Sequence, residues 1–287
     1  MRAGALLLLA AVLCCVGLSG CAGPALSSAW RNRELSIDGK YADWGNYTSY
    51  YDESAKVVLN LANDAEHIYI CLITRNRSVE ARIMESGLTC WFDPAGAKDR
   101  AFGIRFPVGL ARMGISLEEK DRDITRDWQD QTDKSGLIDR EKDRYLSKEF
   151  NQRLETLEAL QDKFEIMSGE LKKPDAKGRP KERPPELTLA EGKKLGVEAR
   201  VGRENDYFVY ELRVPLRRSE LYPYAIGIRP DQPVIGIGLE IAPDMPEFDG
   251  PAGQEEDRGM PAQADRKLRR SGEFKLWATV TLASEDR

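Results

Sequence analysis

Hydrophobic and polar residues alternate along most of the chain beyond residue 35, with the two-residue period of half-buried β-strands. Each run is short, rich in β-branched or aromatic residues, and bounded by Gly, Asn or Asp. This spacing is typical of an antiparallel sandwich and not of βαβ units. The predicted strands are residues 57–61, 67–73, 88–92, 102–108, 197–201, 207–214, 234–241 and 274–282.

The pattern changes between residues 116 and 171, where apolar residues recur at helical spacing. Residues 116–119, Ser-Leu-Glu-Glu, match a capping box at the start of a helix. A longer helix is predicted from about residue 139 to 171, because one apolar stripe continues through it. The stripe contains Leu146, Phe150, Leu154, Leu157, Leu160, Phe164, Met167 and Leu171.

Together the two patterns predict a mainly β protein, an antiparallel, jelly-roll-like β-sandwich with an inserted α-helical hairpin. The sandwich is one domain made of residues 35–115 and 195–287. The insertion, residues 116–194, ends in a loop rich in Pro, Lys and Arg. Within the sandwich, residues 203–206, Arg-Glu-Asn-Asp, separate two strands and predict a β-hairpin.

Alternation also assigns side chains to the two faces of each strand. Trp91 and Trp277 project from faces that otherwise look polar, and Arg105, Arg213 and Glu240 alternate onto similar faces. An exposed Trp on a sheet can hold the apolar face of a sugar while charged neighbours bind its hydroxyl groups. The alternative is that the apolar stripe of the insertion covers both tryptophans.

The N-terminus predicts export. Residues 3–18 form an uninterrupted run of small and apolar residues behind Arg2, too short to span a membrane and typical of a secretory signal. Leu18-Ser19-Gly20-Cys21 resembles the lipobox of bacterial lipoproteins. The resemblance implies removal of residues 1–20, a lipid on Cys21, and a lipidated tether over residues 21–34.

A lipid anchor implies that the membrane is a partner and that the protein belongs to the cell envelope. Ala22 follows the cysteine, which implies the outer membrane if the envelope is Gram-negative, facing the periplasm or the surface. The formal net charge of −5 becomes −6 once Arg2 is removed (−5 minus one positive charge). Such an acidic chain has no general attraction to nucleic acid, so we expect none as a partner.

Five cysteines occur, but two lie in the signal and one is Cys21. The remaining pair, Cys71 and Cys90, both fall in predicted strands. An oxidising envelope permits a disulfide between them, and two buried free thiols are the alternative. Sequence alone does not place their Cα atoms within bridging distance, so both readings stay open.

Four segments resemble, in order, motifs of the family-nine carbohydrate-binding modules and their DOMON-like relatives. They are residues 37–44 (Ile-Asp-Gly-Lys-Tyr-Ala-Asp-Trp), 58–73, 90–94 (Cys-Trp-Phe-Asp-Pro) and 210–216 (Tyr-Glu-Leu-Arg-Val-Pro-Leu). The last departs from the family pattern, because Glu211 directly follows Tyr210. The resemblance covers about residues 35–115 and 196–283. It implies a β-sandwich and, at family level, a carbohydrate or glycan ligand.

Cofactor and catalytic signals are weak. Asp93 and Asp99 are calcium candidates, as in some relatives, but solvated turn carboxylates are the commoner explanation. His67 is the single histidine; some DOMON-like relatives bind haem, yet a solvent-facing position at a strand start is the favoured interpretation. No nucleophile motif, phosphate loop or cysteine metal pair occurs. We therefore expect no enzyme and no cofactor.

These observations favour a lipid-anchored, non-catalytic binding protein of the envelope, with a glycan as the ligand class. One alternative is a structural or assembly lipoprotein whose helical hairpin, residues 116–172, docks an envelope protein. A haem-binding electron carrier is the third and least favoured interpretation.

Overall fold

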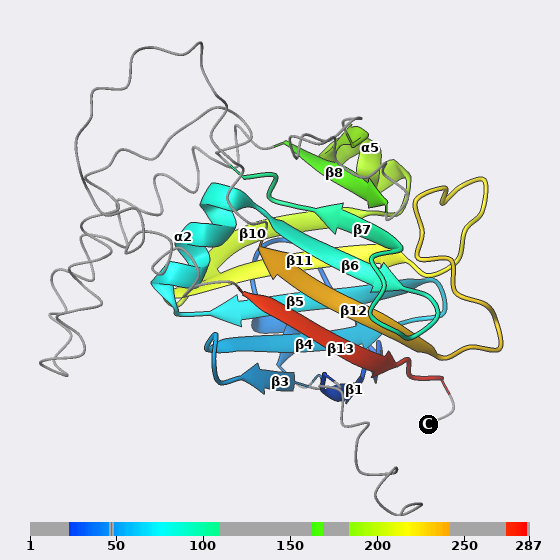
Figure 1. The fold of residues 1–287 in the computed structure, drawn as a ribbon, viewed down its shortest axis with the longest axis horizontal. Helices are drawn as coiled ribbons and strands as arrows, with labels where there is room; N and C mark the ends of the chain where they lie inside the picture. The colour runs from blue at the N-terminus through cyan, green and yellow to red at the C-terminus, as the bar shows by residue number, and fades with distance from the viewer. Residues whose placement is uncertain are drawn as a thin grey trace, which may run out of the picture.

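The structure is a computed structural model, and it describes residues 23–45, 47, 49–109, 162–168, 184–241 and 274–285. These residues build two β-sheets packed face to face, so the predicted β-sandwich is confirmed (Figure 1). The larger sheet has the order β1 (Ala25–Ser27), β13 (Lys275–Thr281), β12 (Val234–Ile241), β6 (Leu88–Asp93), β7 (Phe102–Arg105), β8 (Lys163–Ser168) and β9 (Glu186–Thr188).

The smaller sheet contains six strands. Its order is β10 (Glu198–Glu204), β11 (Tyr207–Pro215), β5 (His67–Thr74), β4 (Val57–Asn63) and β2 (Ala29–Trp30), and β3 (Ser49–Asp52) also pairs with β4. Three short helices complete the described part: η1 (Ala42–Trp44), α2 (Arg77–Ser86) and α5 (Leu189–Lys194). Every predicted strand overlaps an observed one, and β12 has the predicted bounds.

The hairpin predicted at residues 203–206 joins β10 to β11. Its turn is made by Asn205 and Asp206, whose φ angles of 49° and 67° are the left-handed values that a tight hairpin turn requires. Asn and Asp tolerate these values better than other side chains, which explains why this sequence turns here.

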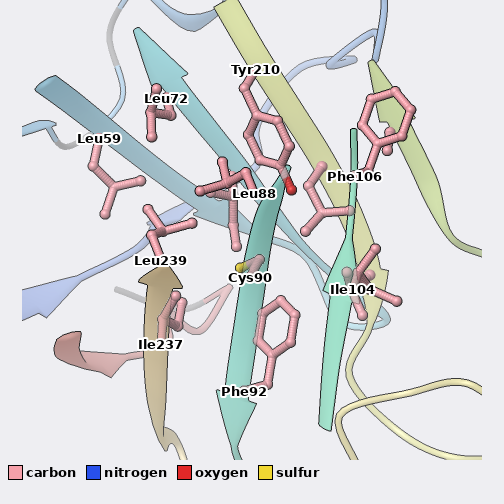
Figure 2. Close-up of a cluster of buried hydrophobic side chains, with 14 of the residues drawn as sticks. Leu59, Leu72, Leu88, Cys90, Phe92, Ile104, Phe106, Tyr210, Ile237 and Leu239 are labelled. Carbon is pink, nitrogen blue, oxygen red and sulfur yellow. The ribbon is translucent and has the colours of Figure 1, made fainter. Parts of the chain in front are cut away.

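The core lies between the inner faces of the two sheets (Figure 2). Leu59, Leu72 and Tyr210 from the smaller sheet meet Phe92 and Ile237 from the larger one, and all are at most 1% exposed. Each fully buried large apolar side chain contributes about 1.5–3 kcal/mol relative to exposure, so this layer is the main source of stability.

Helix α2 was not predicted from the pattern. It begins after Asn76, whose side chain accepts a hydrogen bond from the Ser78 amide at 3.1 Å, and it buries Val79 and Ile83. It ends at Gly87, where φ is 85°. An Asn cap, apolar residues four apart and a closing Gly were therefore all present as signals.

The predicted helix over residues 139–171 is wrong for residues 163–168, because these residues form strand β8 beside β7. Phe164 and Ile166 enter the core, whereas Glu165 and Met167 lie on the outer face. This segment has the two-residue period of a strand, and pairing with β7 satisfies its backbone. The rest of the predicted hairpin, residues 116–161, lies outside the described residues.

The tether assigned to residues 21–34 also needs correction. Residues 25–30 form β1 and β2, which add parallel strands to β13 and β4 respectively. Between them, Ser28 donates its hydroxyl to Asn63 Oδ1 at 2.5 Å and its amide to the Thr281 carbonyl at 3.0 Å. This segment therefore connects the two sheets at one edge of the sandwich.

Candidate functional site

The outer face of the larger sheet carries a row of alternating tryptophan and glycine, which we call the tryptophan row. In register across five neighbouring strands it contains Trp277, Gly238, Trp91, Gly103 and Met167. Trp91, Trp277 and Met167 form an apolar cluster of their own, separate from the core. The sequence had placed both tryptophans on polar-looking faces, and the register brings them onto one face.

The glycines of the row leave room for the indole rings. A Cβ on Gly103 would lie 2.7 Å from Cε3 of Trp91, and a Cβ on Gly238 would lie 2.5 Å from Cζ2 of Trp277. Both rings therefore rest on the backbone of the neighbouring strand. Each tryptophan is only 8% exposed, so neither presents an open ring to solvent.

A second row, the polar row, lies two residues further along the same strands. It contains Lys275, Glu240, Thr89, Arg105 and Glu165. Arg105 donates to Glu165 at 2.9 Å and to the Thr89 hydroxyl at 3.1 Å. Glu165 is 2% exposed, so this ion pair is buried, and removal of either partner would destabilise the face.

Glu240 connects the two rows. Its carboxylate accepts a hydrogen bond from Trp277 Nε1 at 2.7 Å and pairs with Arg100 at 2.6 Å and Lys275 at 3.4 Å. The Arg100 guanidinium lies 5.8 Å from the centre of the Trp91 ring, while its side chain is 53% exposed. Arg100 therefore lies over an indole of the tryptophan row and is also exposed to solvent.

Four of the five predicted ligand-binding residues thus share one face: Trp91, Trp277, Arg105 and Glu240. The fifth, Arg213, lies on β11 in the other sheet and pairs with Glu198 at 2.7 Å. The structure therefore does not bring Arg213 to the face that the other four share, because alternation assigns the face of a strand but not the sheet to which the strand belongs.

The calcium prediction at Asp93 and Asp99 is not supported by their surroundings. Asp93 is 2% exposed, and its carboxylate accepts the amides of Ala95 at 2.8 Å and Asp99 at 3.1 Å, so it closes its own loop. Asp99 is exposed. Among the described residues there is no group of three His, Cys, Asp or Glu side chains that could hold a metal ion.

His67 is buried, at 7% exposed, which corrects the expected solvent-facing position. Its ring packs against Tyr222 at a centroid distance of 5.4 Å, and its Nδ1 lies 3.8 Å from Asp64. Burial acts to raise the pKa of Asp64, but hydrogen bonds from His67, the Glu66 amide and Tyr69 outweigh it and hold that pKa well below its usual range. Asp64 therefore fixes the turn between β4 and β5.

The two remaining cysteines are free, and no disulfide joins them. Cys71 lies on the outer face of β5, in a cluster with Trp44, whereas Cys90 lies in the central core. Burial raises the pKa of both thiols well above the usual value, so both stay protonated and unreactive. Of the two alternatives that the sequence left open, the structure therefore has two buried free thiols and not a disulfide.

A second buried cluster centres on Glu211, on the outer face of the smaller sheet. Its carboxylate accepts hydrogen bonds from Trp44 Nε1 at 2.6 Å and from the amides of Asp38 at 2.9 Å and Gly39 at 2.6 Å. Two of the motifs that carry the family resemblance, residues 37–44 and 210–216, therefore meet at one carboxylate. Sequence reasoning quoted Glu211 in a motif but did not assign it this role.

Two buried carboxyl groups have raised pKa values. Burial raises the pKa of Glu211 to about 7, against the lowering by its three donors. Burial likewise raises the pKa of Glu80 to about 7, although Arg77 and Arg203 pair with it at 3.0 Å each. Both carboxyl groups are buried in polar clusters of the fold, so their pKa values bear on stability.

These pKa values predict a pH dependence of stability. An unfolded glutamate has a pKa of 4.5, whereas Glu211 and Glu80 have a pKa of about 7 in the folded protein. The folded state therefore binds the protons of these two carboxyl groups more tightly than the unfolded state does. The resulting stabilisation is complete below pH 4.5 and is lost as the pH rises through 7, by about 3 kcal/mol per group. We expect a lower free energy of unfolding in urea at pH 8 than at pH 5.

The Glu211→Gln variant tests the origin of this effect, because it keeps the shape of the side chain but cannot titrate. Its free energy of unfolding should change less between pH 5 and pH 8 than that of the wild type. The exposed Glu53→Gln variant is the matched control and should retain the full pH dependence. A protein that is more stable at pH 8 than at pH 5 would contradict the assignment.

No protein-family model matches the chain, and a search of curated proteins finds no significant match either. Among the described residues, no helix combines the length and apolar character needed to cross a membrane.

Proposed function

We propose that this chain is a lipid-anchored, non-catalytic binding protein of the bacterial cell envelope, that the tryptophan row is its recognition face, and that its ligand is a carbohydrate. The observation that carries the proposal is that Trp91 and Trp277 lie on the same sheet face, each directly over a glycine of the neighbouring strand, Gly103 and Gly238. Two indoles on one sheet face, beside a row of charged side chains, match the amphipathic surface of a sugar.

The burial of the row imposes a condition on this function. With 8% exposure, each indole offers only a small part of its surface to a ligand. Stacking of a sugar on Trp91 therefore requires Arg100 to move off the ring, which breaks its 2.6 Å ion pair with Glu240 and is possible because its side chain is 53% exposed. The displaced guanidinium would then donate to sugar hydroxyl groups, while Glu240 would accept from them.

The same burial favours a second candidate function, that of a structural or assembly lipoprotein. A face whose tryptophans are nearly covered is typical of a packing surface. Met167, the member of the row on β8, comes from the segment first assigned to the insertion and clusters with both tryptophans. Under this alternative the row holds the base of the insertion, and the predicted helical hairpin, shortened by strand β8 from residues 116–172 to residues 116–161, docks an envelope protein.

A glycan-array screen of the mature chain without lipid separates the two candidates. We expect selective binding that falls at least about tenfold, or 1.4 kcal/mol, in Trp91→Ala and in Trp277→Ala. Trp30→Ala is the matched control, because it removes an indole from the other sheet and should bind as the wild type does. Circular dichroism confirms that each variant folds. Absence of any glycan binding, or binding unchanged in both row variants, would refute the carbohydrate proposal and favour the assembly role.

A further inference from the structure

The chain enters the sandwich almost immediately after Cys21. Gly23 lies directly against the carbonyl of Trp277, and the carbonyl of Pro24 accepts a hydrogen bond from the Thr279 amide at 3.1 Å. Strand β1 then pairs with β13 from Ala25 onward. Among the described residues, contacts with the sheet therefore begin at Gly23, two residues after the cysteine that we propose to be lipidated.

We propose that the sandwich is held directly against the bilayer, with the β1 edge of the larger sheet at the membrane surface. The inference rests on the proposed lipid at Cys21. Two residues of chain span at most about 7 Å, at 3.3–3.6 Å per residue. A free tether over residues 21–34 would instead allow an extended reach of about 46–50 Å from its 14 residues.

Hydrogen bonds on both sides of β1 oppose its detachment from the sheet. Beyond β1, Ser28 contacts both sheets, and its hydroxyl accepts a bond from the Ala283 amide at 3.2 Å. Arg31 donates its amide to the Asn63 carbonyl at 2.8 Å. Release of the segment would break these bonds together with the β1 ladder, so the short tether is a stable feature of the folded protein.

This attachment orients the larger sheet. Lys98 lies beside the entry point, with its Nζ 3.6 Å from the position of a Cβ on Gly23. The opposite edge is formed by β9, and α5, which follows β9 directly in the chain, lies on the side of the molecule away from β1 (Figure 1). Six strand spacings of about 4.8 Å separate β1 from β9, which places α5 about 29 Å along the sheet from the membrane edge. The tryptophan row begins at β13, next to β1, so the proposed carbohydrate ligand would bind close to the bilayer surface.

Distance-dependent quenching in vesicles tests this orientation on the full lipidated chain. A maleimide dye is attached at Lys98→Cys or at Lys194→Cys, which is exposed on α5. The buried Cys71 and Cys90 do not compete for the dye. With a nitroxide quencher on the lipid headgroups, the dye at position 98 should lose most of its fluorescence and the dye at position 194 little.

The matched control is a Gly/Ser linker of about 20 residues between Ala22 and Gly23, whose ends lie about 25 Å apart on average. It should abolish the quenching at position 98. Equal quenching at both positions, or quenching at position 98 that the linker does not change, would overturn the proposed orientation. The mass of each sample shows whether Cys21 carries a lipid. A Cys21 without lipid would overturn both the proposed anchor and this inference. A lipidated protein with equal quenching at both positions would overturn this inference alone.

Discussion

Replacement of Trp44 by alanine is expected to lower the free energy of unfolding by about 3–5 kcal/mol. The indole is 2% exposed and packs edge-on against Tyr47, with ring centroids 5.8 Å apart. Its Nε1 donates to Glu211, so truncation also removes one of three donors to a buried carboxylate. The loss therefore combines a cavity with a weakened polar cluster, and the sequence motif of residues 37–44 depends on both.

Urea unfolding at pH 7 measures this effect. Trp44→Phe keeps most of the buried ring but lacks the N–H donor, so its cost should be smaller and should report the hydrogen bond, about 1–3 kcal/mol. Tyr51→Ala is the control for loss of an aromatic ring at an exposed position, because Tyr51 is 56% exposed and the change should cost less than about 0.5 kcal/mol. A loss below about 1 kcal/mol for Trp44→Ala would show that residues 37–44 do not hold the outer face of the smaller sheet.

Replacement of Gly238 by alanine is expected to destabilise the protein by about 1–3 kcal/mol and to weaken ligand binding with it. The added methyl group would lie 2.5 Å from the Trp277 indole, which must then lift from the sheet. That movement breaks the bond between Nε1 and Glu240 and disturbs both rows. If Gly238 only allowed backbone flexibility, its replacement by alanine would lower the free energy of unfolding much less.

Gly45→Ala is the matched control, because a Cβ there meets its nearest neighbour, the Ala42 carbonyl, at 4.0 Å. Its φ of −49° also suits alanine, so the change should be neutral or slightly stabilising. Thermal unfolding and glycan binding are measured on both variants. If Gly238→Ala unfolds at the wild-type temperature and binds normally, the indole does not rest on this glycine and the tryptophan row loses its structural basis.

The strands could be predicted from sequence because each turns one apolar face toward the core, and the resulting two-residue period can be recognised without knowing the partner strands. Val234–Ile241 is the clearest case, since its Ile and Leu residues alternate with glycine and Glu240. The turn at Asn205 and Asp206 was also predictable, because its backbone conformation depends on the turn residues themselves. Such local signals need no knowledge of the fold.

Features that depend on pairing could not be predicted in this way. Residues 163–168 fit a helical stripe and a strand equally well, and the free edge of β7 decides for the strand. Arg213 alternates as Arg105 does, yet the two strands belong to different sheets. Likewise the short runs at residues 25–30 are too small to carry a pattern, and only the edges of β13 and β4 make them strands.

The lipid on Cys21 is the claim on which the proposed location, the membrane partner and the orientation of the sheet all depend. Mass spectrometry of the N-terminal peptide from the membrane fraction of expressing bacteria tests it most directly. The account predicts a peptide that begins at Cys21 and carries a diacylglycerol on its thiol. A chain that begins elsewhere, or an unmodified Cys21 on a protein recovered from the aqueous fraction, would contradict it.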